Sequence, residues 1–253
     1  MPRFKMPVFR KMSEKGVARL LFPGGRVDGI LCDITGVLRE SSTSGDGIPI
    51  QGSLEALELL SKSGIQIRFV TNESKGTVRN NYCRPFLLVH DNVLQDFEGL
   101  NSDDPTCVVI GDAVDKFSYE NLNKAFRLLK EKECDLISLG KGKYYREDGE
   151  LTLDVGPYTA ALEFAADRDA IVCGKPDKTF FQAALNSLGL PAERVIMIGD
   201  DIVSDVGGAQ KSGIRGVLVR SGKYTQKDEN HPVVKPDLIV DNLKALVDLI
   251  VQQ

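Results

Sequence analysis

Short apolar runs that end in polar residues alternate with amphipathic segments along most of this chain. Residues 29–33 and 195–199 are such runs, as are residues 65–70 and 216–219. Apolar runs of this length are typical of parallel strands that are buried on both faces of a sheet. The segments between them carry apolar residues at helical spacing, for example in residues 181–188. This alternation predicts a doubly wound, parallel α/β sheet.

Several helix boundaries are marked in the sequence. Gly64 ends a predicted helix over residues 52–62, and Gly189 ends a second helix, because glycine readily adopts the left-handed backbone conformation that closes a helix. Asp241 is predicted to cap the last helix, since a carboxylate can accept hydrogen bonds from the first free amides. The inward-facing residues of this last helix are Leu243, Leu246 and Ile250.

A stretch in the middle of the chain has strands and a helix of its own. Its apolar runs are residues 86–89, 107–110 and 136–139, and residues 118–132 have helical spacing. Because this stretch lies between two strands of the first sheet, we expect an inserted α/β cap domain. The predicted division is an N-terminal extension (1–26), a core (27–83 and 172–253) and a cap (84–171).

The composition excludes several classes of protein. The chain has 253 residues and a net charge of −4, so no overall positive field would attract nucleic acid. No apolar run reaches the roughly 18 residues that a membrane-spanning helix needs. The five cysteines lack C-x-x-C spacing, which argues against a disulfide scaffold or a zinc ribbon and for a reducing compartment. We therefore expect a cytoplasmic protein, also found in the nucleus, without nucleic-acid or membrane partners.

The first 26 residues differ in charge from the rest. They contain seven basic residues and a single acid, Glu14. A segment of this kind is either a solvated, disordered tail or an organellar transit peptide. We favour the tail, and the sequence leaves targeting open.

Polar residues follow four of the predicted strands at the point where each strand ends. Taken singly, each of them is an ordinary turn, cap or surface residue. Parallel strands bring their carboxyl ends to one edge of the sheet, where ligands bind in open α/β folds. Four strand ends that all supply polar groups therefore predict a functional site. The residues are Asp33, Thr71, Asn72, Lys175, Asp200 and Asp201.

These residues lie in four segments that resemble the motifs of the haloacid dehalogenase-like phosphatases. The segments occur in the family's order: DITGV at 33–37, TNES at 71–74, GKP at 174–176 and GDD at 199–201, with Asp205. A longer similarity covers most of residues 27–253. It indicates a branch of the family that acts on phospholysine, phosphohistidine and inorganic pyrophosphate.

The resemblance implies a role for each matched residue. Asp33 would attack phosphorus and form an aspartyl-phosphate that water then hydrolyses. Mg²⁺ would be held by the side chains of Asp33 and Asp200 and by the backbone carbonyl of Thr35. Asp201 and Asp205 would support the metal site from its outer shell. The implied catalytic residues are Asp33, Thr35 and Lys175, and the implied substrate-binding residues are Asp33, Ile34, Thr35, Thr71, Asn72 and Lys175.

Thr35 departs from the family pattern. Most hydrolases of this family have a second aspartate at this position, which acts as general acid and then as general base. A threonine hydroxyl cannot do this at neutral pH, and the loss of a general acid costs about 10²–10⁴ in rate. We therefore expect a preference for P–N and P–O–P bonds, whose leaving groups depart more readily than those of sugar phosphates. The alternative is a weak or inactive phosphatase-like protein that acts as a binding or regulatory module.

The connection between Asn72 and Phe86 is the second departure. Only thirteen residues lie between them. A parallel crossover needs a dozen or more residues and normally contains a helix. The relatives have additional helical sequence at this point, about 30 residues. We expect this to expose apolar surface on one face of the core sheet.

The predicted partners are a phosphorylated small molecule or phosphoprotein as substrate, and a second copy of the chain that binds through the cap.

Overall fold

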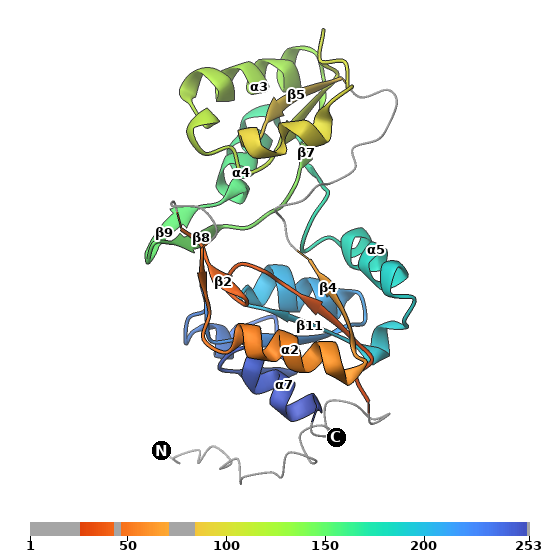
Figure 1. Cartoon of the computed structure of the whole chain (residues 1–253). Helices are drawn as coiled ribbons and strands as arrows, with labels where there is room; N and C mark the ends of the chain where they lie inside the picture. The colour runs from red at the N-terminus through yellow and green to blue at the C-terminus, as the bar shows by residue number, and fades with distance from the viewer. Residues whose placement is uncertain (1–25, 43–46, 71–83, 252–253) are drawn as a thin grey trace, which may run out of the picture.

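The computed structural model describes residues 26–42, 47–70 and 84–251, which form two parallel sheets, each with its own helices (Figure 1). The core sheet has the strand order β13-β12-β11-β1-β4, and the cap sheet has the order β10-β7-β6-β5. The core strands are β1 (Gly29–Cys32), β4 (Gln66–Phe69), β11 (Val195–Gly199), β12 (Arg215–Val219) and β13 (Leu238–Val240). The cap strands are β5 (Pro85–Leu88), β6 (Cys107–Ile110), β7 (Asp135–Ser138) and β10 (Ile171–Val172). The predicted parallel α/β fold with an inserted α/β unit is confirmed.

Alternate residues of β1 face opposite layers of helices. Ile30 packs with Leu60 and Leu246 on one face, and Leu31 packs with Phe181 on the other. This is why the β1 segment is apolar throughout and has no polar alternation. The helices that cover the core sheet are α2 (Ser53–Ser63), α5 (Lys178–Leu188), α6 (Gly208–Lys211) and α7 (Leu243–Val251).

Two predicted helix ends are confirmed, and one predicted cap is wrong. Gly64 and Gly189 close α2 and α5 in left-handed conformations with φ of 75° and 66°. At the start of α7, Asn242 Oδ1 accepts a hydrogen bond from Ala245 N at 3.0 Å. Asp241 instead accepts from Arg220 Nη1 at 2.8 Å, so the cap is one residue later than predicted.

Strand β4 lies at the edge of the core sheet. Phe69 at its end is 49% exposed, whereas every residue of β1 is buried. The chain leaves β4 through residues 71–83, which lie outside the described residues. Apolar clusters pack on both faces of the described core sheet, so the expected exposure of one face through the short connection stays a prediction.

The cap sheet has helices on both faces. Val108 and Leu136 pack against α3 (Tyr119–Glu131) and α4 (Val155–Ala166) on one face, and Val109 packs with Phe97 of η1 (Asp91–Phe97) on the other. The cap sheet includes Val172, one residue beyond the predicted end of the inserted unit. The assignment of this unit as a separate domain stays a prediction.

A hairpin that the sequence analysis missed lies between the two sheets (Figure 1). It consists of β8 (Tyr144–Glu147) and β9 (Glu150–Leu153), and Glu147 forms a bridge with Ser41 of the core. The remaining elements are β2 (Arg39–Glu40), β3 (Ile48–Pro49), the 3-10 helices η2 (Val114–Lys116), η3 (Ala192–Arg194) and η5 (Asp228–Asn230), and the π-helical η4 (Ile202–Gly207).

Two whole-chain expectations can be compared with the described residues. Cys107 is disulfide-bonded, which the cysteine spacing did not predict, whereas Cys32, Cys134 and Cys173 are free. In the described part of the chain, every helix is too short or too polar to cross a bilayer.

Candidate functional site

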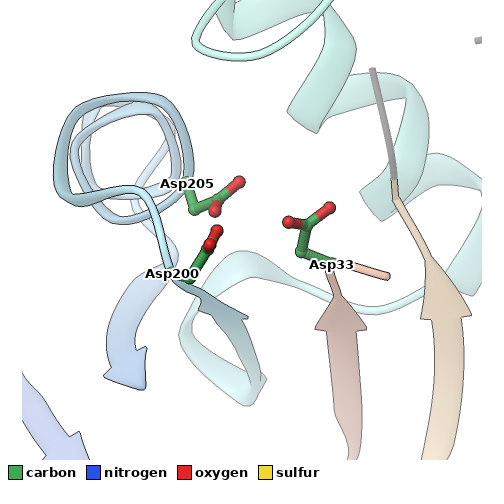
Figure 2. Close-up of side chains that lie close together, drawn as sticks. All are labelled: Asp33, Asp200 and Asp205. Carbon is green, nitrogen blue, oxygen red and sulfur yellow. The ribbon is translucent and has the colours of Figure 1, made fainter. Parts of the chain in front are cut away.

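Three buried carboxylates meet at the carboxyl edge of the core sheet. Asp33 directly follows β1, Asp200 directly follows β11, and Asp205 lies in η4 (Figure 2). Because β1 and β11 are neighbours in the sheet, their ends bring Asp33 and Asp200 together. One oxygen of each of the three carboxylates lies within 4.8 Å of the others. Their residues are only 7%, 4% and 1% exposed, so the charges are largely removed from water.

Lys175 is the cation that faces this cluster. Its Nζ atom donates to Asp33 Oδ1 at 2.7 Å and forms an ion pair with Asp205 Oδ1 at 2.8 Å. Burial alone would lower the pKa of Lys175, but the charges of Asp205 and Asp33 outweigh it and raise this pKa above its usual value. Lys175 is therefore charged at any physiological pH.

The carboxylates have more negative charge than Lys175 can balance. Burial raises the pKa of Asp200 well above its usual value, and Asp33 and Asp205 raise it further, against the opposing charge of Lys223. Burial likewise raises the pKa of Asp205 to about 6, although Lys175 opposes the shift. Shifts of this kind are common among the buried groups of functional sites.

Asp200 has one oxygen that is satisfied and one that is not. Oδ2 accepts a hydrogen bond from Lys223 N at 2.8 Å. Oδ1 is buried and has no hydrogen-bond partner among the described residues. A buried carboxylate oxygen without a partner is costly, and a hard divalent cation such as Mg²⁺ would satisfy it. The donor set therefore fits a metal ion of this kind.

Asp201 shapes the loop that holds these carboxylates. Its Oδ1 accepts from Val203 N and Ser204 N, both at 2.8 Å, and thereby caps η4. Its backbone amide donates to Asp205 Oδ2 at 3.1 Å. Burial would raise the pKa of Asp201, but Lys223 and the two amides outweigh burial and lower it. Asp201 thus contacts the cluster through its backbone, while its side chain fixes the loop.

The sequence analysis missed the loop that follows β12. Lys223 Nζ lies 3.1 Å from Asp201 Oδ2, and Ser221 Oγ donates to Gly36 O at 2.6 Å. Gly222 has φ of 64°, and a Cβ atom there would lie 2.2 Å from Asp200 Oδ2. The signal was the position of this loop at the end of a further core strand, on the same edge as the other motifs.

A cavity of about 410 Å³ lies above the carboxylates and extends to the cap. Asp33, Thr35 and Lys175 line its floor. Ile34 lies in the turn after β1, where its carbonyl accepts from Leu38 N at 2.8 Å. The predicted residues Thr71 and Asn72 lie outside the described residues.

The cap contributes residues to this cavity that the sequence analysis did not select. His90 and Asp112 follow β5 and β6 at the carboxyl edge of the cap sheet, and Tyr145 and Glu147 belong to β8. The cavity therefore has one wall from each sheet. This arrangement can hold a phosphoryl group at the floor and the remainder of a substrate against the cap.

Comparison with known proteins agrees with this geometry. The family model for HAD-hydrolase-like proteins matches residues 172–246. Phospholysine phosphohistidine inorganic pyrophosphate phosphatase from Homo sapiens is 45% identical over 257 residues, which cover 89% of this chain and 95% of that protein. Haloacid dehalogenase-like hydrolase domain-containing protein 2 from Bos taurus is 38% identical over 253 residues, which cover 88% of this chain and 95% of that protein.

A solved structure matches over most of its length. The 4-nitrophenylphosphatase from Thermotoga maritima has a TM-score of 0.76 and 25% sequence identity, and the match covers 88% of this chain and 97% of that chain. The alignment with the human relative spans 257 positions yet uses 89% of the 253 residues here, so part of that relative has no counterpart in this chain. Both the resemblance to this family and the expectation of an enzyme are confirmed. The chain belongs to the haloacid dehalogenase-like hydrolase family.

Proposed function

We propose that this protein is a Mg²⁺-dependent phosphatase that hydrolyses P–N and P–O–P bonds through an aspartyl-phosphate intermediate. The proposed substrates are phospholysine, phosphohistidine and inorganic pyrophosphate, after the name of the relative that is 45% identical. The observation that carries the proposal is the position of Asp33. It ends β1 on the floor of the cavity, and Lys175 holds its Oδ1 at 2.7 Å.

The hydrogen bond to Lys175 defines which oxygen of Asp33 attacks. Because Oδ1 accepts from Lys175, Oδ2 is the oxygen we assign as nucleophile. It forms a bond to phosphorus as the bond from phosphorus to the leaving nitrogen or oxygen breaks, and the leaving group takes that electron pair. Water then attacks the phosphorus of the aspartyl-phosphate, which releases phosphate and restores the carboxylate. Lys175 balances the charge of Asp33 and of the phosphoryl group.

Asp33, Asp200 Oδ1 and the backbone carbonyl of Thr35 are the proposed ligands of Mg²⁺. When bound, the ion neutralises charge on the transferring phosphoryl group. The buried, unpartnered Asp200 Oδ1 and the three adjacent carboxylates support this assignment. Asp201 and Asp205 hold the loop, and Asp205 also shares Lys175 with Asp33.

Thr35 and the motif after β4 complete the proposed site. Ile34, Thr71 and Asn72 are proposed to bind the phosphoryl oxygens together with Thr35 and Lys175. Since Thr35 cannot donate a proton at neutral pH, the enzyme is expected to favour leaving groups that depart unaided.

We further propose a phosphorylated small molecule or a phosphoprotein as substrate and a homodimer formed through the cap. The cytoplasmic and nuclear location also stays a prediction.

Phosphate release from pyrophosphate and imidodiphosphate tests the proposal. Wild type and Asp33→Asn are compared with Mg²⁺ and with EDTA, and Asp135→Asn, an exposed change on the cap sheet, is the matched control. We expect Mg²⁺-dependent release by wild type and Asp135→Asn and none by Asp33→Asn. Release that persists in Asp33→Asn contradicts the mechanism. A folded wild type without any release supports the alternative, a binding or regulatory module.

A further inference from the structure

The cap wall of the cavity is acidic. Asp112, Glu147 and Asp154 line it, and they follow or end the strands β6, β8 and β9. These groups are close enough to affect one another. Burial raises the pKa of Asp112, and the charges of Asp154 and Glu147 raise it further, while a backbone hydrogen bond and His90 oppose the shift. The hydroxyl of Tyr145 hydrogen-bonds with Asp112 and has a raised pKa, mainly because it is buried.

The basic groups around the cavity do not neutralise this wall. Arg146 Nη1 donates to Gly149 O at 2.7 Å in the hairpin turn. His90 Nδ1 accepts from Asn92 N at 3.1 Å. Lys175 and Lys223 form ion pairs with the core aspartates, and Lys223 Nζ also donates to the backbone carbonyl of Tyr144 in β8 at 3.4 Å. The cavity thus has a floor with fixed cations and a cap wall with an excess of carboxylates.

A second observation indicates that the cavity binds a ligand. Asp200 is 4% exposed and lines the same cavity, and its Oδ1 has no hydrogen-bond partner within the described ranges. A cation at the floor would satisfy this oxygen, and under the proposed function the phosphoryl group lies beside it. A substrate whose phosphoryl group lies on the floor places its leaving group toward the cap wall.

We infer that Asp112 and Glu147 form a subsite for a cationic amine leaving group, such as the lysine side of phospholysine. This rests on the proposed function. The P–N nitrogen is protonated before the bond breaks, leaves as a neutral amine with the electron pair of that bond, and then binds a second proton from water, so the product is cationic at neutral pH. Carboxylates accept hydrogen bonds from it and stabilise its charge, whereas they repel the phosphate that leaves from pyrophosphate.

Asp154 is left out of the subsite because it has a structural role. Its Oδ1 accepts from Val155 N at 2.6 Å and caps α4. A Cβ atom on Gly142 would lie 1.8 Å from its Oδ2, so Asp154 is packed closely against the backbone. Asp112 is partly removed from water by its contacts with Tyr145 and Val114 but keeps access to solvent, and Glu147 lies on the hairpin.

The test is the ratio of kcat/KM for phospholysine to kcat/KM for pyrophosphate. It is measured with Mg²⁺ for wild type, Asp112→Asn, Glu147→Gln and the exposed control Asp135→Asn. Each subsite variant keeps the size of the side chain and removes one negative charge from the cap wall, so we expect the ratio to fall by about tenfold. Pyrophosphate hydrolysis should rise or stay constant, and Asp135→Asn should not change the ratio.

The outcomes separate this inference from the proposed function. An unchanged ratio, or an equal loss for both substrates, in both subsite variants overturns the inference and leaves the phosphatase in place. Phosphate release that does not depend on Asp33 overturns the proposed function, and the inference with it. Thermal melting of each variant identifies losses that come from misfolding, and Glu147→Gln provides a second result if Asp112→Asn does not fold.

Discussion

The Nζ atom of Lys175 lies 2.7 Å from Asp33 Oδ1, although the two residues are 142 positions apart in the sequence. Asp33 ends β1, and Lys175 lies between β10 and α5, so the inserted cap unit separates them along the chain. Both residues are nearly fully buried. Burial makes each charge depend on the other, because neither is solvated well enough to be stable alone.

Lys175→Met is expected to reduce both stability and activity. It leaves Asp33 and Asp205 without their shared cation, and the loss of one partner from a buried ion pair costs about 3–5 kcal/mol in the free energy of unfolding. The phosphoryl group also loses a fixed cation, which costs about 10²–10³ in kcat. Urea unfolding and phosphate release measure the two effects. Lys141→Met is the control, since this ion pair with Glu163 is exposed, and an equal effect there contradicts the prediction.

Asp200→Asn is expected to stabilise the metal-free protein. The pKa of Asp200 is raised on folding, mainly by burial, so its stabilising contribution is present at low pH and is lost as pH rises through the folded pKa. Asparagine carries no charge, so the variant does not lose this stability as the pH rises. Its side-chain oxygen can still accept the hydrogen bond from Lys223 N. In EDTA at pH 7.5 we expect a melting temperature about 2–4 °C higher than wild type, with a smaller difference at pH 4.

The same variant tests the metal site. Mg²⁺ should raise the melting temperature of wild type at pH 7.5, because a ligand that binds only the folded state stabilises it. It should have little effect on Asp200→Asn, which lacks one carboxylate ligand. A variant that melts below wild type in EDTA, or that gains as much from Mg²⁺, contradicts the assignment of Asp200.

Gly222→Ala is expected to displace Asp200. The new Cβ atom would lie 2.2 Å from Asp200 Oδ2 and 2.5 Å from Gly36 Cα, and the backbone atom cannot move aside as a flexible side chain could. Gly189→Ala is a closely matched control, because Gly189 has nearly the same φ, 66° against 64°, and nothing within 4 Å of a Cβ atom. Both variants have the backbone strain, and only Gly222→Ala has the clash.

The comparison is made by isothermal titration with Mg²⁺ and by thermal melting. Strain alone costs about 1 kcal/mol in each variant, and the clash in Gly222→Ala adds about 1–3 kcal/mol. We expect Mg²⁺ affinity to fall only in Gly222→Ala. Equal affinities in the two variants would mean that the loop after β12 does not position Asp200.

Thr35→Asp is expected to broaden the range of substrates. Thr35 lines the floor of the cavity, and a carboxyl group there would act as the general acid that this chain lacks. We expect kcat/KM for glucose 6-phosphate to rise by about 10² relative to pyrophosphate. Thr35→Asn is the control, since it has a similar shape and no transferable proton. Parallel changes for both substrates, or a wild type that already prefers the sugar phosphate, would refute the role assigned to Thr35.

Much of the core could be predicted from local sequence patterns. An apolar run such as residues 29–33 forms a strand because both faces of the sheet are covered, and glycine at 64 or 189 ends a helix because of its own backbone freedom. These causes act within a few residues. The position of Asp33 and Asp200 at adjacent strand ends also follows, because parallel strands place their carboxyl ends on one edge.

Other features depend on segments that meet only in the folded chain. The cap of α7 is Asn242, whereas Asp241 pairs with Arg220 from another loop. Asp112 and Glu147 lack a local signal, since an acid at the end of a strand is ordinary in sequence. Their role depends on the side chains that face them in the folded protein.

Sequence by itself therefore determined the parallel α/β fold, the family and the position of Asp33 and Asp200 at the ends of β1 and β11, whereas Lys175 follows β10 of the cap sheet and not a core strand as predicted. Only the tertiary structure decided how charge is arranged around them: Lys175 is shared by Asp33 and Asp205, Asp200 Oδ1 is buried without a partner in the described chain, and the cap wall is acidic. The physical reason is that strand formation depends on local burial patterns, whereas the energy of a charge depends on every group within several ångströms, whatever its position in the sequence.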